Sequence, residues 1–116
     1  MTLLEKEDLP DGFNYPSDFV RVVEQRLNNL TPWVIIFDDE LKERNLGLKS
    51  RYKNRVLVPF ARRLDNDDVA CFDANRIASV LIVHDYAKEG WEERKRFTSF
   101  WDWFRQAVDD MIDHDN

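Results

Sequence analysis

Hydrophobic positions in the first half of the chain recur at helical spacing and then gather into a short run. Residues 18–29 carry apolar side chains three or four positions apart, which predicts an amphipathic helix with one buried face. Residues 33–37 form an apolar run rich in β-branched side chains, which is typical of a strand. Acids at positions 38–40 then favour the first turn of another helix, which Gly47 is placed to end.

The middle of the chain shows shorter apolar runs separated by turn residues. The predicted strands are residues 56–60, 69–72 and 80–83, and the predicted turns are residues 65–68 and 73–76. Pro59 indicates an edge strand or a bulge, because proline has no N–H to donate to a neighbouring strand. Consecutive strands joined by tight turns predict an antiparallel meander, and the unbroken run at 80–83 predicts a strand buried on both faces.

The C-terminal part of the chain predicts a further amphipathic helix after a connection at residues 87–93. Ser99 is a candidate N-cap with Asp102 three residues on, close to a capping box. The apolar side chains that follow on one face are Trp101, Phe104, Val108 and Met111. Trp103 lies off this face and is expected to be partly exposed.

Length and composition favour one domain. The chain has 116 residues, of which 43% are hydrophobic and 13% aromatic, enough for one core. The expected fold class is α+β, with a small antiparallel meander sheet flanked by an N-terminal and a C-terminal amphipathic helix. Residues 1–16 hold two of the four prolines and are expected to form an extended arm, and residues 109–116 an acidic tail.

The net charge of −6 hides an asymmetry along the chain. Residues 42–63 include eight basic residues and one acid, a net charge of +7, which leaves −13 elsewhere. The acid-rich stretches of the remainder are Asp65, Asp67, Asp68 and Asp73, then Asp109, Asp110, Asp113 and Asp115. Such stretches suit a basic partner, whereas an acidic chain without a recognisable binding motif argues against a nucleic-acid-binding domain.

Two further features bear on location and redox chemistry. The single cysteine, Cys71, lies in an apolar strand and is expected to pack as a buried hydrophobe. No apolar run approaches the roughly 20 residues of a membrane helix, and the first ten residues contain three acids and no signal-peptide pattern. We therefore expect a cytoplasmic protein that does not associate with membranes.

The order of these parts resembles the SUKH superfamily, which includes fungal regulators of cell-wall glucan synthesis and many bacterial immunity proteins that neutralise toxins. The resemblance covers roughly residues 56–112 and follows an N-terminal amphipathic helix. The segments that carry it are VPFA at 58–61, DNDD at 65–68, VACFD at 69–73, an apolar strand ending in His84-Asp85, and SFWDWF at 99–104.

The resemblance implies an α+β fold, no catalytic centre, no cofactor, and a function in binding another protein. For an immunity protein the partner is a secreted toxin, often a nuclease with a basic surface, and opposite charge speeds such an association. An exposed tryptophan is a favoured anchor at interfaces. The candidate partner-binding residues are therefore Asp65, Asn66, Asp67, Asp68, Asp73, Trp91 and Trp103.

Other interpretations stay open at this point. Asp67, Asp68, His84 and Asp85 would be the residues of a metal-assisted hydrolase, since His titrates near neutral pH and a carboxylate can orient it. A regulatory or scaffold domain would share every feature of an immunity protein except its partner. The basic segment at 42–63 would serve as a solvated face or as an edge for a homodimer.

Overall fold

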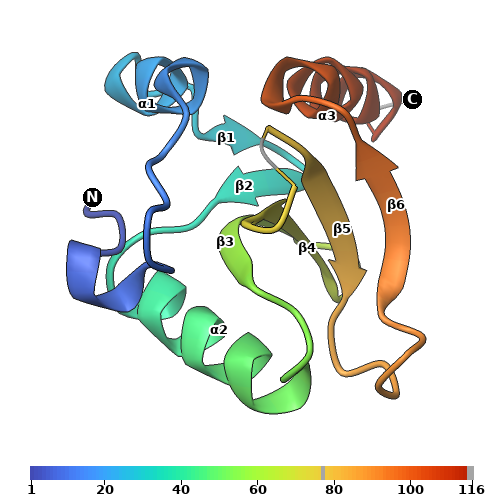
Figure 1. Ribbon diagram of the computed structural model, residues 1–116. Coiled ribbons are helices and arrows are strands. Elements are labelled where there is room, and N and C mark those ends of the chain that lie inside the picture. Colours follow the sequence, from blue (N-terminus) through green and yellow to red (C-terminus); the bar gives the residue numbers. More distant parts are fainter. Residues whose placement is uncertain (77, 115–116) are drawn as a thin grey trace.

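An antiparallel meander of strands forms the centre of the molecule (Figure 1). The computed structural model describes residues 1–76 and 78–114, and within these residues the sheet has six strands, paired in chain order. The strands are β1 (Asn29–Leu30), β2 (Trp33–Ile35), β3 (Leu57–Arg63), β4 (Asp68–Asp73), β5 (Val80–His84) and β6 (Glu93–Phe97). The helices are the 3₁₀ turn η1 (Lys6–Asp8), α1 (Ser17–Glu24), α2 (Asp38–Arg51) and α3 (Phe100–His114). The predicted α+β class with an antiparallel meander is confirmed.

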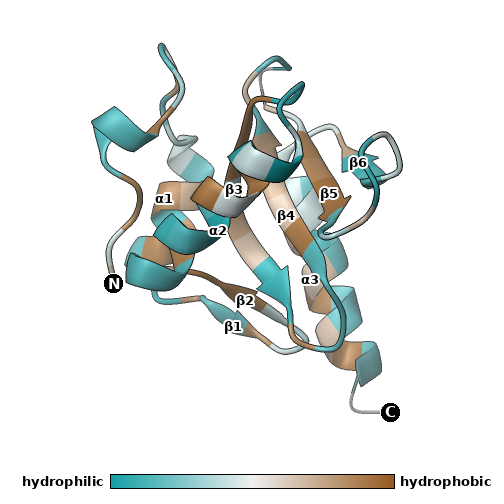
Figure 2. Ribbon diagram, turned by 90° about the horizontal axis from the view of Figure 1, so that it is seen from below, coloured by the Kyte–Doolittle hydropathy of each residue, from teal (hydrophilic) through white to brown (hydrophobic). Residues whose placement is uncertain are grey.

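Helices cover the sheet on both faces: α1 and α3 lie on one side, and α2 lies on the other (Figure 1). Successive side chains of a strand point to opposite faces. Phe72 and Ile82 therefore join the core beneath α1 and α3, whereas Cys71 and Leu81 belong with Leu48 of α2 to a separate cluster. Figure 2 shows the resulting hydrophobic colours along β4 and β5. The burial predicted for Cys71, and for β5 on both faces, is confirmed.

Aromatic rings fill the core on the side of α1 and α3. Phe60 of β3 and Phe72 of β4 stack with their ring centroids 4.4 Å apart. Phe19 of α1 meets both rings edge-on, at 5.4 Å and 5.3 Å. Phe100 and Trp103 of α3 contact Phe60 at 5.8 Å and 4.9 Å. These rings join both helices to the middle of the sheet.

The expectation that Trp103 is partly exposed is wrong. Its side chain lies in the core, and the residue is only 1% exposed, whereas Trp101 is 36% exposed. The fully buried face of α3 consists of Phe100, Trp103 and Ala107, because positions i, i+3 and i+7 share one side of a helix. Phe104 is only partly buried and packs against the edge of this face.

Two elements differ from the predicted boundaries. Helix α2 continues past Gly47 to Arg51, because Leu48 and the following Tyr52 bury their side chains against the sheet. Strand β6 occupies a segment for which no strand was expected. Its residues are mostly charged because the sheet ends at β6, and charged side chains are common on edge strands. The predicted bulge at Pro59 is present, although β3 lies inside the sheet rather than at its edge.

The N-terminal arm wraps the domain. Leu4 is buried, and its backbone N–H donates a 3.2 Å hydrogen bond to the hydroxyl of Tyr15. Residues 109–114 of the predicted acidic tail form the last turns of α3, and Asp115 lies outside the described residues. None of the helices in the described ranges is both long and apolar enough to cross a bilayer.

Removing a ring from the centre of the aromatic core should strongly destabilise the fold. We expect Phe60→Ala to lower the free energy of unfolding by roughly 3–5 kcal/mol, through lost burial and the cavity left behind. Urea denaturation followed by circular dichroism measures this change. Leu46→Ala, at a position 65% exposed on α2, is the matched control and should change stability by less than about 0.5 kcal/mol. Equal effects of the two substitutions would contradict the described core.

Candidate functional site

Two connections lie side by side at one end of the sheet. They are the β3–β4 turn (residues 64–67) and the β5–β6 loop (residues 85–92), together called the loop edge below. The backbone N–H of Asp85 donates to the carbonyl of Asp67 at 3.0 Å, and Asp68 pairs with His84 in the strand register. In a meander every second connection falls at the same end, so the fold itself brings these segments together.

The loop edge gathers most, but not all, of the residues predicted to bind a partner. Residues 65–68 and Trp91 lie there. Asp73 lies at the opposite end of β4, where it pairs with Leu57 and accepts a 3.0 Å hydrogen bond from Arg96. Trp103 belongs to the core and is not available to a partner at the surface.

Arginines within the protein neutralise much of the acidic turn. Asp65 accepts a 2.8 Å hydrogen bond from Arg63, and this bond holds the pKa of Asp65 below its usual value. Asp68 is buried and lies 2.9 Å from the Arg94 Nε and 3.1 Å from the His84 Nδ1. Asp67 is exposed and has no ion pair among the described residues. The turn therefore presents less negative charge than its sequence suggests.

Asn66 has a structural role in this turn. Its side-chain oxygen accepts a 2.8 Å hydrogen bond from the backbone N–H of Asp68. This bond closes an Asx turn, which fixes the backbone where β4 begins. Asn66 is also exposed, so its side chain borders the loop edge while holding the turn in shape.

The four residues considered for a metal-assisted hydrolase do not converge. Asp68 and His84 contact each other on the α3 side of the sheet, whereas Asp85 binds arginines of α2 on the other side. The carboxylate of Asp67 has no hydrogen bond to any of the other three in the described structure. Over residues 1–76 and 78–114, no group of three or more His, Cys, Asp or Glu side chains is placed to hold a metal ion.

A buried carboxylate anchors the start of the β5–β6 loop. The Asp85 side chain is fully buried, and its Oδ2 accepts 2.7 Å hydrogen bonds from both Arg44 and Arg51 of α2. Its Oδ1 accepts the Arg51 Nε–H at 2.7 Å and the backbone N–H of Tyr86 at 2.8 Å. Burial alone would raise the pKa of Asp85, but the bonds from Arg51 and Arg44 outweigh it and leave the pKa below its usual value.

A second buried carboxylate anchors the end of the same loop. Glu92 accepts a 2.6 Å hydrogen bond from the Arg55 Nε–H and another, also 2.6 Å, from the backbone N–H of Gly90. Burial opposes ionisation of Glu92, yet the Arg55 bond and the backbone bonds lower its pKa. The Tyr52 hydroxyl donates to the carbonyl of Ala87 at 2.9 Å. Both ends and the middle of the loop are thus fixed to the α2 side of the protein.

The loop presents two exposed aromatic rings. Trp91 is 78% exposed, as its position in a connection led us to expect, and Tyr86 is 65% exposed. The Arg51 guanidinium lies 4.3 Å from the centre of the Tyr86 ring and holds that ring on one side. The backbone N–H of Trp91 donates to the Lys88 carbonyl at 2.8 Å, which closes a turn at the tip. A large apolar side chain therefore faces solvent from an ordered loop.

Sequence reasoning missed the residues that order this loop. The basic segment at 42–63 was expected to form a solvated face, but its Arg44, Arg51 and Arg55 bind the two buried carboxylates. The available signal in the sequence was a pair of acids, Asp85 and Glu92, at the two ends of the connection that contains Trp91. Spacing alone does not pair them with arginines more than 30 positions away.

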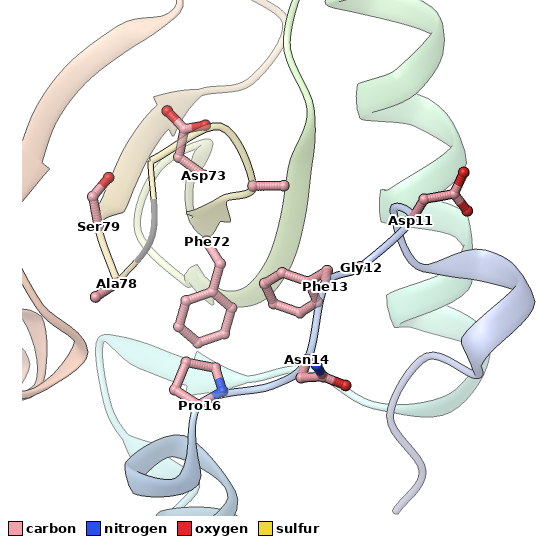
Figure 3. A pocket seen from close by; sticks show the side chains of 10 residues that line it. Asp11, Gly12, Phe13, Asn14, Pro16, Phe72, Asp73, Ala78 and Ser79 are labelled. Carbon is pink, nitrogen blue, oxygen red and sulfur yellow. The ribbon is translucent and has the colours of Figure 1, made fainter.

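A separate hollow of about 460 Å³ lies at the other end of the sheet, between the N-terminal arm and the β4–β5 turn. Figure 3 shows the rings of Phe13 and Phe72 beside each other in its lining, with Pro16 below, and the two ring centroids lie 5.9 Å apart. Asp11 points away from these rings, and Asp73 sits at the rim, where Arg96 binds it. The hollow is mainly apolar, and among the described residues that line it no set of free polar groups is directed into it.

Comparisons with protein-family models, with curated proteins and with solved structures found no match to this chain. The resemblance to the SUKH superfamily therefore stays a prediction from the sequence. The residues and geometry of the loop edge are the basis for the function proposed below.

Removing the charge at the loop anchor should destabilise the protein in a pH-dependent way. We expect Asp85→Asn to lower the free energy of unfolding at pH 7 by roughly 3–5 kcal/mol, because two arginines lose their buried partner. The lowered pKa of Asp85 means that its contribution is present above the unfolded-state pKa of about 3.9 and is lost as pH falls through the lower folded-state pKa. Urea denaturation at pH 7 and at pH 3 measures both effects.

The difference between wild-type and Asp85→Asn protein should therefore shrink at the lower pH. Asp65→Asn is the matched control, because Asp65 forms a surface pair whose loss should cost no more than about 1 kcal/mol. A pH-independent difference for Asp85→Asn, or one no larger than for Asp65→Asn, would show that Asp85 is not a buried ionised anchor.

Proposed function

We propose that this protein is a non-enzymatic, SUKH-like protein-binding domain that acts as a bacterial immunity protein. It neutralises a toxin in the cytoplasm by binding and occluding it, and needs no cofactor. The observation that carries the proposal is Trp91, a tryptophan that is 78% exposed on a loop anchored by two buried carboxylates. The sequence resemblance supplies the kind of partner.

The anchoring of the loop favours binding. Ordering a flexible side chain or loop at an interface costs free energy, and a loop that is already ordered avoids most of that cost. Asp85 and Glu92 hold the ends of the loop, and Tyr52 holds its middle. Because Trp91 is largely exposed, its side chain contributes little to the core. A tryptophan that becomes buried on binding is among the residues that contribute most to the affinity of a protein interface. The exposed Trp91 is suited to that role.

Electrostatics favours a basic partner such as a nuclease toxin. The chain carries a net charge of −6, so a basic protein is attracted over a distance comparable to the Debye length. Asp67 and Glu89 are exposed at the loop edge without ion pairs in the described structure, and they would flank the contact made by Trp91. In this proposal Trp91 supplies the affinity, and the acids supply orientation and association rate.

Growth protection by variants of the loop edge tests this function. The toxin to use is the product of a reading frame adjacent to the gene, expressed with and without this protein. We expect the wild-type protein to relieve growth inhibition, and Trp91→Ala to weaken the complex by roughly 30-fold, since anchor residues contribute about 2 kcal/mol or more. Calorimetric titration of the purified pair measures the dissociation constant.

Leu46→Ala is the matched control, because it removes an exposed hydrophobe from α2, outside the loop edge. Both variants should keep the wild-type unfolding midpoint. If the wild-type protein gives no protection, the proposed immunity role is wrong. Equal affinity of Trp91→Ala and wild-type protein would remove Trp91 from the interface, and a complex without effect on growth would favour a regulatory or scaffold role.

A further inference from the structure

Helix α2 contains a glycine in its interior that bears on the loop edge. Gly47 lies between Arg44 and Arg51 on one face of α2, since positions i, i+3 and i+7 share a side of a helix. Both arginines bind the buried carboxylate of Asp85, at the start of the β5–β6 loop. We propose that Gly47 positions Tyr86, through Arg51, as a second aromatic contact of the loop edge. The contact rests on the function proposed above, whereas the positioning does not.

A side chain at position 47 would collide with the guanidinium of Arg51. A Cβ atom on Gly47 would lie 2.6 Å from the Arg51 Nη2, 2.9 Å from its Nη1 and 3.1 Å from its Cζ. The end of a free arginine side chain moves between rotamers at little cost. Here, however, both the Nη2 and the Nε of Arg51 bond the buried Asp85 at 2.7 Å. Arg51 therefore cannot move away from a larger residue at position 47 without losing part of its bonding to Asp85.

A glycine is otherwise unfavourable at this place in the helix. Glycine in a helix interior is less stable than alanine, because its backbone loses more freedom on folding. Gly47 does not end α2, which continues to Arg51. Its backbone is also outside the left-handed region, unlike that of Gly12 and Gly90. Neither helix termination nor backbone geometry therefore explains the glycine, whereas the close approach of Arg51 does.

Arg51 extends this constraint to the ring of Tyr86. Its Cζ lies 4.3 Å from the centre of that ring, which is largely exposed. The backbone φ of Tyr86 is 67°, in the left-handed region that few residues other than glycine and asparagine adopt. The 2.8 Å hydrogen bond from the Tyr86 N–H to the Asp85 Oδ1 holds this conformation. Strained residues persist where the surrounding structure fixes them, and they concentrate at functional sites. An exposed aromatic ring is thus oriented before any partner binds.

The surroundings of Tyr86 suit the basic partner proposed above. A hollow of about 200 Å³ beside the ring is lined by Glu43 and by the two arginines that bind Asp85. Those arginines direct their charge to Asp85, whereas Glu43 is exposed and has no ion pair in the described part of the chain. Tyrosine is enriched among the residues that contribute most to interface affinity. With Arg51 on one face, Tyr86 offers its other face and its hydroxyl to a partner.

A cycle of substitutions in α2 tests the positioning. We expect Gly47→Ala to lower the urea midpoint of unfolding, although alanine is the better helix former. Arg51→Lys removes the Nη1 and Nη2 atoms that lie closest to position 47 but keeps a positive charge. In that background Gly47→Ala should raise the midpoint instead. Ser50→Ala is the matched control, because Ser50 is exposed on α2, and it should raise the midpoint slightly in both backgrounds.

Nuclear magnetic resonance measures the orientation of Tyr86 in the absence of a partner. The chain has three tyrosines, and Tyr86→Phe identifies the ring signals of Tyr86. We expect a nuclear Overhauser contact between the Arg51 side chain and the Tyr86 ring in the wild-type protein and in Ser50→Ala. Gly47→Ala should lose this contact. A glycine that affected only the stability of the helix would leave it in place.

Binding to the toxin of the adjacent reading frame tests the contact. We expect Tyr86→Asn to weaken the complex roughly tenfold, because it removes an aromatic ring from the interface. Asparagine tolerates the left-handed backbone at position 86, so this variant should keep the wild-type unfolding midpoint. Gly47→Ala should also weaken the complex, and Ser50→Ala should leave it unchanged.

Each outcome bears on the proposal. The positioning is wrong if Gly47→Ala raises the midpoint in the wild-type background, or if it keeps the contact between Arg51 and Tyr86. If Gly47→Ala does not fold, folding in the Arg51→Lys background supports the positioning, and failure in both backgrounds contradicts it.

The contact is wrong if Tyr86→Asn binds the toxin as tightly as the wild-type protein does. If Trp91→Ala then still binds less tightly, the proposed function stands without Tyr86. If the wild-type protein binds no toxin, the proposed function is wrong, and so is the role of Tyr86 as a contact for that partner. The measurements on α2 decide in that case whether Gly47 positions Tyr86.

Discussion

Burial of the central strands on both faces is the constraint on which the rest of the structure depends. The side chains of β4 and β5 pack under α1 and α3 on one face and under α2 on the other, so neither face is free to meet another molecule. Exposed surface of the sheet is confined to its edges and to the connections between strands. The loop edge, to which the proposed function is assigned, lies there.

The second face also explains the ion pairs of the loop edge. Helix α2 contributes few hydrophobic side chains to the core, mainly Leu41 and Leu48. Its Arg44 and Arg51 reach beyond that contact to Asp85. The same helix therefore covers the sheet with its apolar residues and orders the β5–β6 loop with its basic ones. Packing and loop geometry are coupled through one element.

Sequence patterns predicted the fold well where apolar residues formed runs, and less well where charge decided the structure. The strands around Phe60, Phe72 and Leu81 followed from hydrophobic runs and turn residues. Strand β6 was missed because an edge strand needs few apolar residues. The rotation of α3 was misjudged at Trp103, since several aromatic residues in succession leave the buried face of a helix ambiguous. The site depended on pairs such as Arg55 with Glu92, which only the three-dimensional structure brings together.

The way the β5–β6 loop is anchored has a consequence for evolution. Tyr52 bonds a backbone carbonyl, and Glu92 bonds the backbone N–H of Gly90, so these contacts do not depend on the side chains at the tip. Lys88 and Trp91 can change identity without loss of core packing or of the anchoring bonds. In the proposed binding role, point substitutions at the tip would therefore change the recognition surface and leave the scaffold unaltered.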